Sequence, residues 1–146
     1  MNGEVRWTFY GYRTPSGACD VQEWFDGLTG EERDEASDTI LYLRVLPLES
    51  WGRPPYALLG GGLSEIRFKV NSLNRTYRIY GFFWPGGQRY VYTLLLGHFK
   101  KVKNPEHEIA IARKRKEDVE QGRTSIHEFR FTKRTDRPAK TRPAVS

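Results

Sequence analysis

Residues 63–101 read LSEIRFKVNSLNRTYRIYGFFWPGGQRYVYTLLLGHFKK, and this stretch decides the fold. Apolar and polar residues alternate in its first part, and aromatic and β-branched residues dominate the remainder. The pattern predicts three β-strands, at residues 63–70, 75–84 and 89–99. An Asn-containing turn separates the first two strands, and Pro85-Gly86-Gly87 separates the last two. Connections this short join antiparallel neighbours, so we expect the three strands to form an antiparallel meander.

The two faces of this predicted sheet differ in polarity. The first strand places its apolar residues on one face and its charged residues on the other: Glu65, Arg67 and Lys69. The third strand is apolar on both faces at residues 94–96, so we expect it in the middle of the sheet. It ends in a histidine and several lysines: His98, Lys100, Lys101 and Lys103. A sheet face with this charge can bind an anion, and it is the candidate functional site.

Composition favours a single domain with an anionic partner. The chain has 146 residues, 38% of them hydrophobic, which is enough for a core of its own. Cys19 is the only cysteine, so we expect no disulfide framework and a reducing, cytoplasmic location. No apolar run is long enough for a signal peptide or a bilayer span, so no membrane partner is expected. The net charge of +6 favours nucleic acid as the partner, and an acidic protein second.

Ahead of the meander we expect one strand and two helices. Residues 4–13 alternate in polarity and predict a strand at an edge of the same sheet. Asp20 and Thr29 each begin a capping-box pattern, so they predict two helix starts. Residues 48–62 are rich in Pro and Gly and predict a long loop, and loops of this length are often functional.

After the meander, Asn104-Pro105 predicts the start of a third helix, which Gly122 ends. Residues 123–146 are strongly basic, and we expect a disordered tail beyond a short segment that can dock through Ile126, Phe129 and Phe131. We therefore divide the chain into a domain of residues 1–122 and a basic C-terminal tail of residues 123–146. The predicted order β-α-α-β-β-β-α defines an α+β fold. Its antiparallel or mixed sheet has about four strands, and the two N-terminal helices cover one face.

Three short motifs occur in succession along the chain. They are GLSEIR at residues 62–67, YRIY at 77–80, and FKK at 99–101, which precedes Pro105 and EIAIA at 108–112. Together with the order of the predicted elements, these motifs resemble the RelE/ParE superfamily of bacterial toxins, and most nearly its HigB-like, phage-derived branch. The resemblance covers roughly residues 5–122 and implies a RelE-like fold there.

The resemblance also implies a function. Proteins of this kind are toxins of type II toxin–antitoxin systems, and many are endoribonucleases that cut mRNA on the ribosome. The expected partners are therefore mRNA, the ribosome and a cognate antitoxin, for which we expect a helix-turn-helix protein. Two alternatives stay open. One is a ParE-like protein that inhibits DNA gyrase without catalysis, and the other is an inactive phage-derived relic.

Metal-free RNA cleavage needs a base for the 2′-hydroxyl, cations for the charged intermediate and a proton donor for the leaving oxygen. Arg67 and Arg78 are the candidate phosphate ligands, because a guanidinium binds two oxygens at once. The alternative is that they are solvated strand residues. Glu65 is either the base or the partner that orients Arg67. We favour the orienting role, since a carboxylate among cations is a weak base. The remaining catalytic candidates are an acid or base and two cations: His98, Lys100 and Lys101.

Further residues are candidates for holding RNA. Tyr80 lies on the same side of its strand as Arg78 and is a candidate for stacking on a base. Lysines and arginines around the sheet end and on the third helix are candidates for sequence-independent phosphate contacts: Lys69, Lys103, Arg113 and Lys114. His107 and His127 have no spacing that suggests a metal site, so no metal and no cofactor are expected.

Overall fold

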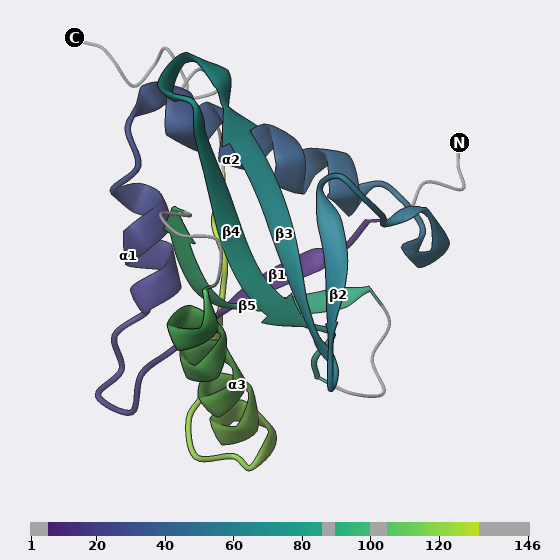
Figure 1. Ribbon diagram of the computed structural model, residues 1–146. Helices are drawn as coiled ribbons and strands as arrows, with labels where there is room; N and C mark the ends of the chain where they lie inside the picture. Colours follow the sequence, from purple (N-terminus) through teal and green to yellow (C-terminus); the bar gives the residue numbers. More distant parts are fainter. Residues whose placement is uncertain (1–5, 86–89, 100–104, 132–146) are drawn as a thin grey trace, which may run out of the picture.

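A computed structural model describes residues 6–85, 90–99 and 105–131 (Figure 1). Within them lie three α-helices: α1 (Asp20–Asp26), α2 (Gly30–Arg44) and α3 (Glu106–Glu120). The same residues form one six-stranded sheet of β1 (Thr8–Tyr12), β2 (Tyr56–Gly60), β3 (Leu63–Val70), β4 (Arg75–Phe82), β5 (Val91–Phe99) and β6 (Ile126–Glu128). The fold is therefore α+β, and no helix among the described residues is both long and apolar enough to cross a bilayer.

The sheet has the strand order β2-β3-β4-β5-β1-β6. Strands β3, β4 and β5 form the expected antiparallel meander, and β5 lies in the interior of the sheet as its apolar sequence predicts. Strand β1 pairs in parallel with β5, and every other pairing is antiparallel. In Figure 1, α1 and α2 lie on one face of the sheet and α3 lies on the other.

Several expectations about the strands were wrong. The sheet has six strands rather than about four, because β2 and β6 form in segments expected to be a loop and part of the tail. The sequence of β2 does not alternate between apolar and polar residues, since Leu58 is apolar although it is 75% exposed. Gly60, Gly61 and Gly62, all at positive φ, close the hairpin between β2 and β3. Strand β1 is not an edge strand, since β6 pairs along its free side.

The helix signals were largely confirmed. Thr29 and Glu32 form the expected capping box at the start of α2. Helix α1 instead has Cys19 at its N-cap, without a capping side chain. Helix α3 begins directly after Pro105, and Gly122, at positive φ, lies just past its end. Asn104 lies outside the described residues.

The core has two parts, one on each face of the sheet. The larger part lies under α1 and α2 and is rich in aromatic side chains, among them Trp7, Phe9, Phe25, Trp51 and Tyr92. Helix α1 approaches β5 closely, because a Cβ at Gly97 would lie 2.4 Å from the ring of Trp24. The smaller part lies under α3, and its edge borders the charged face of the sheet. Covering by α3 therefore leaves only part of that face open.

Candidate active site

The strand register brings five of the predicted site residues together. Arg67 of β3 lies opposite Arg78 of β4, and Arg78 lies opposite His98 of β5. Glu65 lies opposite Tyr80 in the next row. Directly opposed residues of antiparallel strands share a face, so all five side chains start from the same side of the sheet. The sequence prediction that Arg67 and Arg78 share a face is confirmed.

Glu65 holds both arginines. Its Oε1 accepts a hydrogen bond from Nη1 of Arg78 at 3.1 Å, and its Oε2 lies 3.5 Å from Nε of Arg67. The side chain is buried, with 3% of the residue exposed. Each carboxylate oxygen faces a different guanidinium, and a carboxylate so placed fixes the positions of both cations. The contacts therefore suit the orienting role for Glu65 better than the role of base.

Arg78 is buried, which the sequence did not predict. Only 10% of its side chain is exposed, whereas 26% of the Arg67 side chain is exposed. The Nε of Arg78 is also buried, and it has no hydrogen-bond partner among the described residues. The alternative that both arginines are solvated strand residues is therefore wrong for Arg78. A buried guanidinium with an unused N–H is a ready donor for an anion that enters the site.

Tyr80 and His98 form a pair beside the arginines. The Tyr80 hydroxyl lies 3.0 Å from Nε2 of His98, and the two rings stack with centroids 5.4 Å apart. Nδ1 of His98 lies 3.2 Å from the carbonyl oxygen of Phe99. A carbonyl only accepts hydrogen bonds, so Nδ1 carries the proton and Nε2 accepts from the Tyr80 hydroxyl. Because Tyr80 is 0% exposed, its ring is not open to an RNA base, and stacking there is ruled out in this structure.

Burial sets the protonation of this pair. It raises the pKa of Tyr80 to about 12, so the hydroxyl stays protonated at neutral pH. It also lowers the pKa of His98 from its usual value, while the negative charge of Glu108 on α3 opposes that shift. His98 is therefore neutral at physiological pH, with its basic nitrogen turned toward Tyr80.

A hollow of about 310 Å³ adjoins Arg67. It is lined by residues of β3, the start of β4 and the Pro-rich loop ahead of β2: Pro54, Pro55, Arg67, Phe68, Lys69 and Thr76. Lys69 is exposed at this rim, as its alternation predicts. Pro54, Pro55 and Thr76 were not among the predicted site residues, although the length of the loop was a signal for function. The hollow gives an anion a route to Arg67 without opening the core.

Two basic residues of α3 that were predicted to contact RNA phosphates already have partners within the protein. Arg113 donates to the carbonyl oxygens of Gly60 and Leu59 at 3.0 and 3.1 Å, which ties α3 to the β2–β3 hairpin. Lys114 pairs with Asp118 at 2.8 Å, one turn along the helix. Both are exposed, and their side-chain contacts are with these groups and not with Glu65, Arg67 or Arg78. Lys100, Lys101 and Lys103 lie outside the described residues, and no group of His, Cys, Asp and Glu among the described residues is arranged to hold a metal ion.

The chain is thus a small α+β protein in which one buried glutamate holds two arginines on a face of the sheet. A family model described as phage-derived Gp49-like protein (DUF891) matches residues 23–117, more than half of the chain. The chain therefore belongs to the Gp49-like family, a RelE-type, toxin-like family. A search of curated proteins and a search of solved structures each found no significant match.

Proposed function

We propose that this protein is the toxin of a type II toxin–antitoxin system and that it cleaves mRNA on the ribosome. Membership of a toxin-like family supports the first part. The observation that carries the second part is the Glu65 cluster, in which one buried carboxylate fixes two guanidinium groups beside a neutral histidine. In this reaction a base takes the proton of the ribose 2′-hydroxyl, the 2′-oxygen attacks the adjacent phosphorus, and the bond to the 5′-oxygen breaks as that oxygen takes a proton from a donor, for which Lys100 and Lys101 are the candidates.

Arg67 and Arg78 would bind the scissile phosphate. Each arginine contacts the Glu65 carboxylate through one of its guanidinium nitrogens. The other N–H groups of both side chains are left for phosphate oxygens. The bound guanidinium groups would stabilise the extra negative charge of the pentacoordinate intermediate, and burial of Arg78 strengthens that interaction. Glu65 is then a positioning residue rather than the base.

His98 is the candidate base. It is neutral and can accept a proton, but its Nε2 is occupied by the Tyr80 hydroxyl. A base role therefore requires the 2′-hydroxyl to replace Tyr80 at that nitrogen, or the imidazole ring to turn. The Tyr80→Phe variant separates these roles. It should keep or raise cleavage if Tyr80 only occupies the base, and lose cleavage if the hydroxyl itself donates a proton.

The test is induced expression followed by mapping of mRNA ends. The wild-type chain should arrest growth and leave new 5′ ends within translated messages, and Arg67→Ala should do neither. Arg75→Ala is the matched control, because Arg75 pairs with a different carboxylate, that of Glu32 at 3.8 Å. Intact mRNA with reduced DNA supercoiling would instead support the gyrase inhibitor. Normal growth with intact mRNA and unchanged DNA supercoiling would support the inactive relic.

The partners follow from the same proposal. The substrate is mRNA in the cytoplasm, and the net charge of +6 favours association with ribosomal RNA. Binding through phosphate contacts weakens as salt concentration rises, so ribosome association should fall steeply with ionic strength. A helix-turn-helix antitoxin encoded beside this gene would complete the system.

A further inference from the structure

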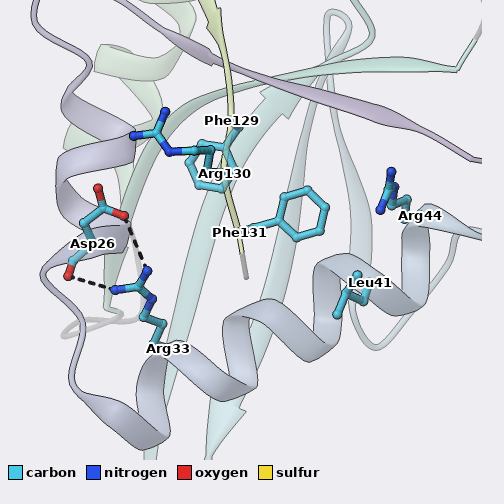
Figure 2. Close-up of a pocket in the computed structure, with 7 residues that line it drawn as sticks. All are labelled: Asp26, Arg33, Leu41, Arg44, Phe129, Arg130 and Phe131. Atoms are coloured by element: carbon cyan, nitrogen blue, oxygen red, sulfur yellow. Dashed lines mark hydrogen bonds and ion pairs between the residues drawn. The ribbon is translucent and has the colours of Figure 1, made fainter. Parts of the chain in front are cut away.

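A second hollow lies on the opposite side of the sheet from the candidate active site. It has a volume of about 350 Å³ and lies between α2 and the extended segment of residues 129–131. In Figure 2, Arg33 and Asp26 lie on one side of that segment, and Leu41 and Arg44 lie on the other. We call it the α2 pocket. None of its lining residues has a role in the proposed cleavage.

The wall formed by residues 129–131 is held firmly in place. The side-chain amide of Gln22 donates to the carbonyl oxygen of Arg130 and accepts from its backbone N–H, both at 2.8 Å. The backbone N–H of Phe129 donates to the carbonyl oxygen of Phe9 at 2.8 Å. Gln22 is itself buried. The pocket is thus already formed in the free protein, which lowers the entropic cost of filling it.

The lining combines apolar surface with positive charge. Leu41, Phe129 and Phe131 supply the apolar part, and the charged lining residues are three arginines (Arg33, Arg44 and Arg130) and one carboxylate, that of Asp26. The Arg44 guanidinium lies 5.7 Å from the ring centre of Phe131. The Nε of Arg33 is buried without a hydrogen-bond partner among the described residues, and its Nη2 is 3.9 Å from Asp26. These groups suit a ligand that carries an apolar side chain next to a carboxylate.

We propose that the α2 pocket binds an acidic, leucine-containing peptide segment of a partner protein. This deepens the proposed function, because it places the antitoxin's anchor on the α2 side instead of over Arg67 and Arg78. The chain's own continuation is a poor occupant, since residues 132–146 carry five Lys and Arg against Asp136. RNA held by Arg67 would lie across the other face of the sheet. An acidic partner also gains encounter rate from the net charge of +6.

The test uses the full chain and a short fluorescein-labelled peptide of alternating leucine and glutamate, followed by fluorescence anisotropy. The control peptide replaces every glutamate by glutamine. The pocket variant is Arg130→Glu, whose side chain is exposed and whose backbone contacts to Gln22 are unaffected by the change. Arg53→Glu is the matched charge reversal at an exposed arginine that does not line the pocket. Arg67→Gln reports on the candidate active site.

The acidic peptide should bind wild type, Arg53→Glu and Arg67→Gln alike. Arg130→Glu, and the glutamine peptide on wild type, should each bind about tenfold more weakly. Loss of binding in Arg67→Gln would overturn the proposal, because it would place the peptide on the active-site face. A single-stranded RNA that binds and loses affinity in Arg130→Glu would overturn it in favour of RNA, and absence of peptide binding would also overturn it.

The two proposals fail separately. Arg130→Glu should still arrest growth and cut mRNA when expressed alone, because the α2 pocket is not part of the cleavage site. If wild-type protein binds the acidic peptide but cuts no mRNA, the docking site stands and the endonuclease is wrong. If mRNA is cut but the peptide is not bound, the endonuclease stands and the docking site is wrong.

Discussion

Two buried glutamates, Glu32 and Glu65, are bound in opposite ways. Glu32, at the start of α2, accepts hydrogen bonds from the Thr29 backbone N–H at 2.9 Å and from the Tyr77 hydroxyl, with Arg75 3.8 Å away at the rim. Glu65 faces only guanidinium groups among its contacts within the described residues, those of Arg67 and Arg78.

The difference agrees with a structural role for Glu32 and with the proposed role of Glu65 in positioning the two arginines. Neutral groups donate the hydrogen bonds that the Glu32 carboxylate accepts, and the bond from Tyr77 joins α2 to β4. The Glu32 carboxylate therefore stabilises the fold. Glu65 instead fixes two cations that still have N–H groups to offer, and the buried Nε of Arg78 is one of them. Under the proposed function, these remaining N–H groups bind the phosphate. Substitutions at each glutamate and its partners test this contrast, in order of decreasing effect.

Arg78→Ala should have the largest effect. Removing the guanidinium leaves the buried Glu65 charge with only Arg67, which should cost about 3 kcal/mol of stability. Cleavage of mRNA should fall at least about a hundredfold, because a transition-state donor is lost. Chemical denaturation and end mapping measure the two effects. The double variant Glu65→Gln with Arg78→Ala should regain part of the stability without any cleavage, and no regain would mean that the buried charge is not the cause.

Arg67→Ala and Arg75→Ala form a matched pair, one arginine for each glutamate. Both side chains are partly exposed, so each change should alter stability by less than about 1 kcal/mol. Only Arg67→Ala should reduce cleavage, by about a hundredfold. Arg67→Lys should recover little, because lysine keeps the charge and loses the forked donor. Equal cleavage by the two alanine variants would remove Arg67 from the site.

Glu32→Gln should destabilise the protein by about 2 kcal/mol, because it weakens the capping box and the bond from Tyr77. Cleavage per folded molecule should be unchanged.

Burial raises the pKa of Glu32, but the hydrogen bonds from Thr29 and Tyr77 lower it by more, so the net pKa lies below its usual value. The stability from Glu32 is therefore present above pH about 4.3 and is lost as pH falls below it. Denaturation curves against pH should show this acid loss in wild type and not in the variant.

His98 should also make the stability of the fold decrease as pH falls, by a smaller amount than Glu32 and at a higher pH. Burial lowers the pKa of His98, so below pH about 6.5 the unfolded chain binds a proton that the folded imidazole does not. Stability should therefore decrease as pH falls from about 6.5, and His98→Gln should remove that slope. A thermal unfolding series between neutral and mildly acidic pH measures it. An unchanged slope in His98→Gln would assign the effect to another group.

Removal of residues 132–146 should have the smallest effect. The core residue Phe129 and its contacts remain, so cooperative thermal unfolding should persist with little change in midpoint. Ribosome association should weaken modestly, since cations are lost from the chain. Loss of the cooperative transition would show that the tail is part of the fold.

Local sequence signals determined a large part of this structure. Strand alternation put Glu65 and Arg67 on one face, the capping box of Thr29 fixed the start of α2, and the apolar residues 94–96 put β5 inside the sheet. These features depend on neighbours within a few positions, so periodicity and turn chemistry contain them. The short motifs carried the resemblance to RelE-type toxins, and the family match places the chain in the Gp49-like family, while the HigB-like branch stays a prediction.

Only the tertiary structure decided the environment of the site. Burial of Arg78, the bond from Tyr80 to His98 and the two contacts of Glu65 depend on the register between strands and on the covering by α3. The pairing of β1 with β5 and β6 joins segments about 80 and 115 residues apart in the sequence, which no local pattern encodes. The α2 pocket arises in the same way, because Gln22 of α1 and Phe9 of β1 hold residues 129–131 in place. The sequence determined which side chains share a face, and long-range packing decided which of them are buried, paired or free to bind.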